Sequence, residues 1–517
     1  MLLLLTAAVY FPVASADFVW DDQWLLVENV RLRGDLLPLL ATDYATLSDL
    51  PGQAGYWRPL LMADYWMDWR LFGLDPMGWH LHSLGWHLIA VGFLFRLLQP
   101  FGPWPALGGA AWMALHPLNS EAVAWVSARN DPMATALLLG GLLALRRRER
   151  AWWGVGALLS LGALLCKESA ILAPVFLWGL ETVPRPPLRP RLLVIGAALG
   201  LGLSLRPLLG IPSPPLLDLV HLQAALPRFP FLLGLVGNKL LGFSLSSTTH
   251  LQYLQFSPVD LIGWLVLVLL VGKRPGGLAL AFIALVPSLW TVIQTGIFGD
   301  RYLYLPMVGL SLGLARTLAQ WNQGRAEQAG RFAGMVVLLL LAGIYRLENR
   351  LLNWMDGTSL FSAEVENAPN PYNRQLLAWY LLKDKRPEAA LKELLPLLNE
   401  HPPIPELYDT GLRAAVAVQQ YREAQQFGEA GIVVDPNRNA EYRGLLALSE
   451  AAMGQWDRAE YWGKSTLEEA PEGPGALAVA AAQSAAGAPP PNAAVQRLLE
   501  LGMASRGLRP YPEVIDR

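Results

Sequence analysis

Long apolar runs alternate with short polar segments up to about residue 346. A helix that crosses a bilayer needs about 20 mostly apolar residues. The pattern predicts about eleven such helices, near residues 2–16, 79–98, 103–118, 131–145, 151–166, 169–183, 191–208, 259–272, 278–297, 301–319 and 331–346. Beyond residue 346 the chain becomes polar and helical. We therefore expect an all-α fold in which a polytopic membrane bundle, residues 1–346, precedes a helical tail.

The sequence of this helical tail contains a repeated pattern. Similar residue pairs recur at Glu388-Ala389, Glu423-Ala424 and Arg458-Ala459, and Pro402, Pro436 and Pro471 close the successive units. This spacing is close to the period of about 34 residues of tetratricopeptide (TPR) repeats, each of which is a pair of helices. The pattern predicts a linker at 347–370 and a TPR-like α-solenoid at 371–517, with 475–504 as a capping pair. Such a stack presents a concave binding surface.

Basic clusters predict the orientation, because Lys and Arg are enriched in cytoplasmic loops. The clusters are Arg146 to Arg148, Arg185 to Arg191, Lys273-Arg274, and Arg325 with Arg331. An odd number of spans places all of them in the cytoplasm and turns the tail and three loops outward. These loops are residues 17–78, 116–130 and 209–258. Within the last loop, Phe229 to Leu245 is apolar enough for a half-buried helix at the interface.

Composition narrows the class of protein. Hydrophobic residues make up 53% of the chain and charged residues 16%, whereas soluble domains carry about 25% charge. The 20 Trp residues suit membrane interfaces, and a net charge of −2 offers no basic field for polyanions. These values exclude a disordered chain, a soluble enzyme and a nucleic-acid binder. Only seven of the 40 basic residues are Lys, which indicates a GC-rich bacterial genome and hence a bacterial inner membrane, with the outward loops in the periplasm.

An acidic pair, Asp21-Asp22, follows the first predicted span and lies among aromatic residues. Burial and a like charge raise a carboxyl pKa, and a carboxylate poised in this way can act as a general base. The alternative interpretation is a solvated helix end beside interfacial Trp residues.

Further polar residues are predicted on the same outer face. They are His116, Glu121, Arg129, Asp131, Lys167, Glu168, Arg58, Arg301, Tyr302 and Tyr304. Ionisable groups at membrane depth usually line a site, and an Arg can grip a phosphate in bidentate fashion. The alternatives are helix caps, a snorkelling Lys and ordinary interfacial anchors, since Tyr302 and Tyr304 can sit at the lipid interface. Their convergence on one face favours an anionic substrate attached to lipid.

Seven strings occur in an order that carries a family resemblance. They are Asp21-Asp22, Tyr56-Trp57-Arg58-Pro59-Leu60, Gly78-Trp79-His80-Leu81-His82, Leu115-His116-Pro117 with Glu121-Ala122-Val123, Ala128-Arg129-Asn130-Asp131, Lys167-Glu168-Ser169, and Asp300-Arg301-Tyr302-Leu303-Tyr304-Leu305-Pro306. With the repetitive tail, they resemble the transmembrane and TPR-repeat-containing protein O-mannosyltransferases. The family strings are close to Arg-Ala-Asp and Glu-Arg-Tyr where this chain has Arg129-Asn130-Asp131 and Asp300-Arg301-Tyr302.

The resemblance implies a GT-C glycosyltransferase that moves a sugar, mannose in this family, from a polyprenyl-phosphate donor to Ser or Thr hydroxyls of exported proteins. It implies that Asp21 or Asp22 is the base, with Asp21 preferred, and that Arg301 binds the donor phosphate. His116, Glu121, Arg129 and Lys167 are then donor-site or supporting residues.

Other interpretations remain open at this stage. A GT-C transferase acting on a lipid-linked glycan shares the same machinery, and the tail alone suits a membrane-anchored TPR scaffold. A transporter is less favoured because no matching pair of broken apolar segments indicates inverted repeats. Asp21 and Asp22 could ligate Mg²⁺ or Mn²⁺ through oxygen, but the expected mechanism requires no metal.

Overall fold

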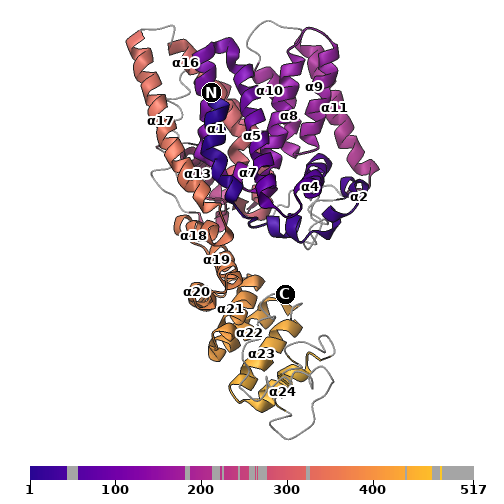
Figure 1. Ribbon diagram of the computed structural model, residues 1–517, viewed down its shortest axis with the longest axis vertical. Coiled ribbons are helices and arrows are strands. Elements are labelled where there is room, and N and C mark those ends of the chain that lie inside the picture. Colours follow the sequence, from indigo (N-terminus) through magenta and orange to yellow (C-terminus); the bar gives the residue numbers. More distant parts are fainter. Residues whose placement is uncertain are drawn as a thin grey trace. The chain divides into compact units, whose positions relative to one another are not determined.

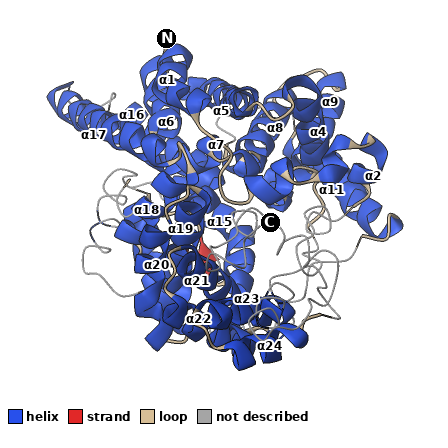
Figure 2. Cartoon of the chain, turned by 60° about the horizontal axis from the view of Figure 1, so that its bottom comes forward, coloured by secondary structure: helices blue, strands red, loops and turns tan. Residues whose placement is uncertain are grey.

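The computed structural model describes residues 1–42, 56–180, 187–211, 226–240, 245–254, 276–321, 326–436 and 439–467, with isolated positions at 222–223, 242, 262, 265, 475, 478–479 and 482. Helices dominate these residues (Figure 2). The strands among them are β1 (Thr249–His250) and β2 (Ile297–Phe298), which pair antiparallel with Thr249 opposite Phe298. The predicted all-α class is confirmed.

The chain divides into two compact units, Met1–Leu360 and Phe361–Arg517. Residues 347–370, expected as a linker, lie largely in helices α17 (Ala326–Asn353) and α18 (Gly357–Asn367). The other helices of the first unit are α1 (Leu2–Tyr10), α2 (Leu36–Leu40), α4 (Pro59–Phe72), α5 (Pro76–Leu98), α6 (Pro103–Leu115), α7 (Ser120–Ala124), α8 (Asn130–Leu145), α9 (Ala151–Leu164), α10 (Ala173–Gly179), α11 (Leu188–Leu208), α13 (Phe229–Lys239), α15 (Gly276–Thr295) and α16 (Tyr304–Trp321). Figure 1 shows α5, α8, α9 and α11 side by side.

Three described helices are both long and apolar enough to cross a bilayer: Pro76–Phe101, Leu188–Leu208 and Gly276–Ile293. They correspond to the spans predicted near 79–98, 191–208 and 278–297. Shorter apolar helices cover Leu2–Ser15, Ala151–Leu164 and Glu168–Gly179. The span predicted at 259–272 lies almost wholly outside the described residues.

Glycines bring α15 and α16 into close contact. A Cβ atom on Gly277 would lie 2.5 Å from the Cα of Gly313, and one on Gly309 would lie 2.5 Å from the backbone nitrogen of Ala281. Small residues allow such an approach in apolar surroundings, where van der Waals packing holds helices together. This contact holds α16, whose first residue lies three positions after Arg301.

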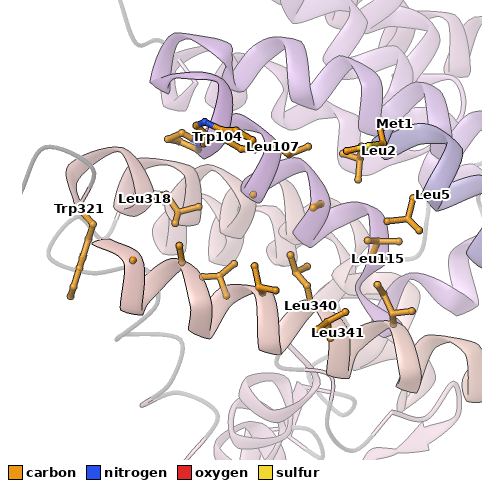
Figure 3. Close-up of a pocket in the computed structure, with 18 residues that line it drawn as sticks. Met1, Leu2, Leu5, Trp104, Leu107, Leu115, Leu318, Trp321, Leu340 and Leu341 are labelled. Carbon is orange, nitrogen blue, oxygen red and sulfur yellow. The ribbon is translucent and has the colours of Figure 1, made fainter. Parts of the chain in front are cut away.

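An apolar pocket of about 690 Å³ lies between α1, α6, α16 and α17 (Figure 3). Its lining includes Leu5, Trp104, Leu115, Leu318 and Leu340, and none of the described lining side chains is charged. The pocket therefore offers hydrocarbon contacts, and the polar chemistry of the first unit lies elsewhere.

The second unit repeats a pair of packed helices. The pairs are α19 (Pro371–Lys383) with α20 (Pro387–Leu394), α21 (Pro405–Ala417) with α22 (Tyr421–Val434), and α23 (Asn439–Ala452) with α24 (Trp456–Lys464). The turn inside each pair contains a residue in the left-handed region, at Lys385 (φ 59°), Gln419 (φ 62°) and Gly454 (φ 75°). The spacing of these turns matches the repeat seen in the sequence. The capping pair expected at 475–504 lies mostly outside the described residues.

Candidate active site

The acidic pair, Asp21-Asp22, directly follows a backbone bend at Trp20. Trp20 has a φ of 55°, a strained conformation for a bulky side chain and one that clusters at functional sites. Its indole stacks on that of Trp125, with ring centroids 4.6 Å apart and 15° between the ring planes. The stack holds the bend, so the two carboxylates that follow it are held in place as well.

Asp22 is fully buried and held by hydrogen bonds. Its Oδ1 accepts from the backbone N–H of Ser127 at 2.8 Å and from the Ser127 hydroxyl, and its Oδ2 accepts from the N–H of Val19 at 3.3 Å. Burial raises the pKa of Asp22 to about 7, although these hydrogen bonds act to lower it. Asp22 therefore ties the bend to the segment around Ser127.

Asp21 differs from its neighbour. It is half-buried, and none of the described residues donates a hydrogen bond to its carboxylate. Burial raises the pKa of Asp21 to about 6, and the positive charge of Arg301 opposes this rise. An accessible carboxylate with a pKa near the working pH suits a general base. The geometry thus favours Asp21 as the base and Asp22 as its support.

Arg301 lies in η10 (Asp300–Leu303), the 3₁₀ turn that leads into α16. Its Nη1 donates to Oε1 of Glu121 in a short contact, and its backbone N–H donates to Oε2 at 3.2 Å. Glu121, on α7, is fully buried, and burial raises the pKa of its carboxyl to about 7 against the effect of Arg301. Gly299 permits this approach, because a Cβ atom there would lie 2.5 Å from Nη1 and 2.9 Å from Oε1.

Three aromatic rings surround the Arg301 guanidinium. Its central carbon lies 4.8 Å from the ring centroid of Trp125, 4.7 Å from that of Tyr302 and 5.7 Å from that of Trp20. These distances are within the range of cation–π attraction. The Arg301 side chain remains 17% exposed. The guanidinium is thus fixed in orientation but accessible, as a binding group for an anion must be.

Two further cations adjoin this group. Lys167 places its Nζ 2.5 Å from Oδ1 of Asp131 and 5.8 Å from the ring centroid of Tyr302. Arg58 places its Nη2 3.0 Å from Oε2 of Glu168. Each of these cations pairs with a carboxylate, which holds it in place.

The three cations influence one another. Burial lowers the pKa of Lys167, Asp131 opposes this, and the charges of Arg58 and Arg301 lower it further. These effects place the three cations within electrostatic reach of one another. The structure therefore gathers one set of predicted residues into a single region: Asp21, Asp22, Arg58, Glu121, Asp131, Lys167, Glu168, Arg301 and Tyr302.

Arg129 is engaged in a different cluster. Its Nη1 donates to Asp64 at 2.6 Å and to Asp68 in a shorter contact, its Nε donates to Ser83 at 2.8 Å, and its Nη2 donates to the Trp79 carbonyl at 2.7 Å. Asp64 and Asp68, with His82, could together hold a metal ion. In this structure the guanidinium already supplies the positive charge among them. Arg129 therefore anchors the segment that carries Trp125 and Ser127.

Two other predicted residues have structural contacts. Tyr304, considered above as a donor-binding residue or an interfacial anchor, is fully buried in the first unit, and its hydroxyl lies 2.7 Å from Nδ1 of His87 on α5. His116 is also buried. Its Nδ1 accepts from the N–H of Leu118 at 3.3 Å, and its ring centroid lies 5.1 Å from that of Trp112.

Part of the chain is similar in sequence to several protein O-mannosyl-transferases. The chain is 33% identical over 192 residues to the protein O-mannosyl-transferase Tmtc1 of Drosophila melanogaster, covering 35% of this chain and 22% of that protein. It is 32% identical to Tmtc2 of the same fly, over 33% of this chain and 20% of that protein, and 28% identical to human TMTC2, over 32% and 21%. Along about a third of its length, the chain is thus similar in sequence to the TMTC proteins. The matched part spans about a fifth of the length of these relatives. No family model and no solved structure matches the chain.

Several residues around this site were not predicted from the sequence. Trp125, Ser127, Lys239 and Arg350 belong to no string that carries the resemblance. A signal for Lys239 was present, since a lone charge inside an apolar stretch is costly and usually has a partner. Trp125 and Ser127 gave none, because their roles depend on contacts with Trp20 and Asp22, more than 100 positions earlier in the chain.

Proposed function

We propose that this chain is a membrane glycosyltransferase of the GT-C class. It transfers mannose from a polyprenyl-phosphate donor to Ser or Thr hydroxyls of exported proteins. One observation carries the proposal: a half-buried Asp21 carboxylate lies within the electrostatic reach of an accessible Arg301 that Glu121 and three aromatic rings hold in place. A base beside a fixed cation suits transfer from an anionic leaving group.

The reaction assigns a role to each group. Asp21 accepts the proton of the acceptor hydroxyl while its oxygen attacks the anomeric carbon of mannose. The bond from that carbon to the phosphate oxygen breaks, and the polyprenyl phosphate leaves with the electron pair. Arg301, with Lys167 and Arg58 nearby, stabilises the negative charge on the departing phosphate. Fixed donors of this kind are most effective where water is excluded.

Positive side chains thus supply the charge that a divalent cation would supply in another site. We propose a mechanism that requires no metal, in which Arg301 faces the phosphate with Lys167 and Arg58 nearby. Addition of a chelator is then without effect on the rate of transfer.

The membrane arrangement forms part of the proposal. About eleven spans keep Asp21 and Arg301 on the extracytoplasmic face, which in a bacterial inner membrane is the periplasmic face. The helix pairs of the second unit form a TPR-like stack on the same side. Apolar helices and relatedness to TMTC proteins support a membrane protein. The stack offers a surface for the exported acceptor.

The pH profile of transfer tests the base. Burial raises the pKa of Asp21 to about 6, and only the ionised carboxylate can accept a proton. We expect the donor kcat/KM to rise with pH through about 6 and to level off above it, as measured with a mannosyl donor and a Ser-containing peptide in vesicles. A profile that is flat between pH 5 and 8 contradicts this assignment.

A further inference from the structure

A buried ion-pair cluster lies beside Arg301. Asp300 and Lys239 are fully buried, and Lys239 Nζ donates to Oδ1 of Asp300 in a short contact and to the Ser246 carbonyl at 2.9 Å. From another direction, Nη2 of Arg350 lies 3.8 Å from Oδ2 of Asp300 and donates to the Ser247 hydroxyl at 2.8 Å. One carboxylate is thus held between two cations.

The cluster connects three segments that are far apart in the chain. Lys239 is the last residue of α13, Arg350 lies near the end of α17, and Asp300 immediately precedes Arg301. A buried ion pair is weak evidence for stability, because apolar residues of similar volume often stabilise a fold equally well. Its better-attested use is to fix the register between elements.

The relevant register is the position of Arg301 relative to these elements. The peptide between Asp300 and Arg301 is held at both ends, by the Asp300 carboxylate in the buried cluster and by the Arg301 backbone N–H on Glu121. We infer that Lys239, Asp300 and Arg350 are positioning residues that set where the Arg301 guanidinium meets the phosphate of the lipid donor. This inference rests on the proposed function. It also makes the end of α13 part of the active region.

Binding and transfer by the full-length protein in zwitterionic vesicles test the inference. The variants are Lys239→Met, Asp300→Asn and the double variant, with Asp300→Glu as the conservative change. A shift of about 1 Å in a positioned group can cost a hundredfold. We expect the donor kcat/KM to fall about a hundredfold and the affinity for polyprenyl phosphate to fall with it, while the acceptor KM stays unchanged and Asp300→Glu retains most activity.

The double variant separates positioning from folding. Lys239→Met removes one of the two cations beside the buried Asp300 carboxylate and lowers thermal stability. Adding Asp300→Asn removes the carboxylate charge and recovers part of that stability, because Arg350 then keeps its hydrogen bond to Ser247 but loses the carboxylate. Affinity for polyprenyl phosphate stays low in both variants. Arg228→Met is the matched control, since Arg228 lies in the same segment and donates to the Leu254 carbonyl at 3.2 Å.

The outcomes are distinguishable. A double variant with wild-type affinity for polyprenyl phosphate overturns the inference, as does a loss of activity that merely follows the amount of folded protein. If wild-type protein binds polyprenyl phosphate and the variants do not, the inference stands even where no mannose is transferred. In that case the proposed reaction is the part that fails.

Discussion

Replacing Asp21 with asparagine is expected to lower the rate of mannosyl transfer by roughly 10³-fold, within the range that a general base contributes. The amide has nearly the same size as the carboxylate but cannot accept the proton of the acceptor hydroxyl. Because no described residue donates a hydrogen bond to Asp21, the fold should be unchanged. The affinity for polyprenyl phosphate should not fall, since the change removes a negative charge within reach of Arg301. Transfer of labelled mannose to a Ser-containing peptide measures the rate.

Asp17→Asn is the matched control for this prediction. Asp17 is an exposed carboxylate four residues earlier on the same loop, so its replacement should leave the rate unchanged. Asp22→Asn is a second comparison, since Asp22 is held by Ser127. If Asp22→Asn removes transfer while Asp21→Asn retains it, Asp22 is the base and the assignment to Asp21 is wrong.

Replacing Arg301 with methionine is expected to lower kcat by about 10² to 10³-fold, as the loss of one fixed donor at a site of developing charge does. Methionine keeps much of the apolar stem but cannot neutralise the departing phosphate. The donor KM should rise as well, because the same guanidinium binds the ground-state phosphate. Steady-state kinetics with varied donor at saturating acceptor measure both effects.

Two further variants distinguish this loss of activity from a folding defect. Arg301→Met together with Glu121→Gln removes the buried carboxylate that the single change leaves unpaired, and it should restore thermal stability but not activity. Arg70→Met removes another Arg, one packed 5.0 Å from the ring centroid of Trp66, and should leave activity unchanged. An Arg301→Met protein with wild-type donor kcat/KM contradicts the phosphate-binding role.

The sequence allowed the helical class and the polar residues near the site to be predicted, because both leave local signals. Apolar runs of helical length identified α5, α11 and α15, and charges such as Lys167 and Arg301 stood out from apolar surroundings. Motif order then linked Asp21 to Arg301, although 280 positions separate them in the chain. Local signals do not show which residue each charged side chain contacts.

The contacts made in the folded protein determine the roles of three predicted residues. Arg129 has the residue type of a phosphate ligand, but Asp64 and Asp68 engage it. Tyr304 has the residue type of an interfacial anchor, but it is buried against His87. Asp22 carries the same carboxyl group as Asp21, and the hydrogen bonds from Ser127 and Val19, together with full burial, distinguish it from Asp21. These distinctions depend on tertiary packing, which a single sequence does not contain.

The most direct test of the account is a donor comparison with the purified full-length protein in vesicles. The protein is given a peptide with Ser and Thr residues and either polyprenyl-phosphate mannose or a soluble nucleotide-activated mannose, and the peptide is then analysed by mass spectrometry. The account predicts O-linked mannose on the peptide from the lipid donor alone. Transfer from the soluble donor, or an unmodified peptide with the lipid donor, would contradict it.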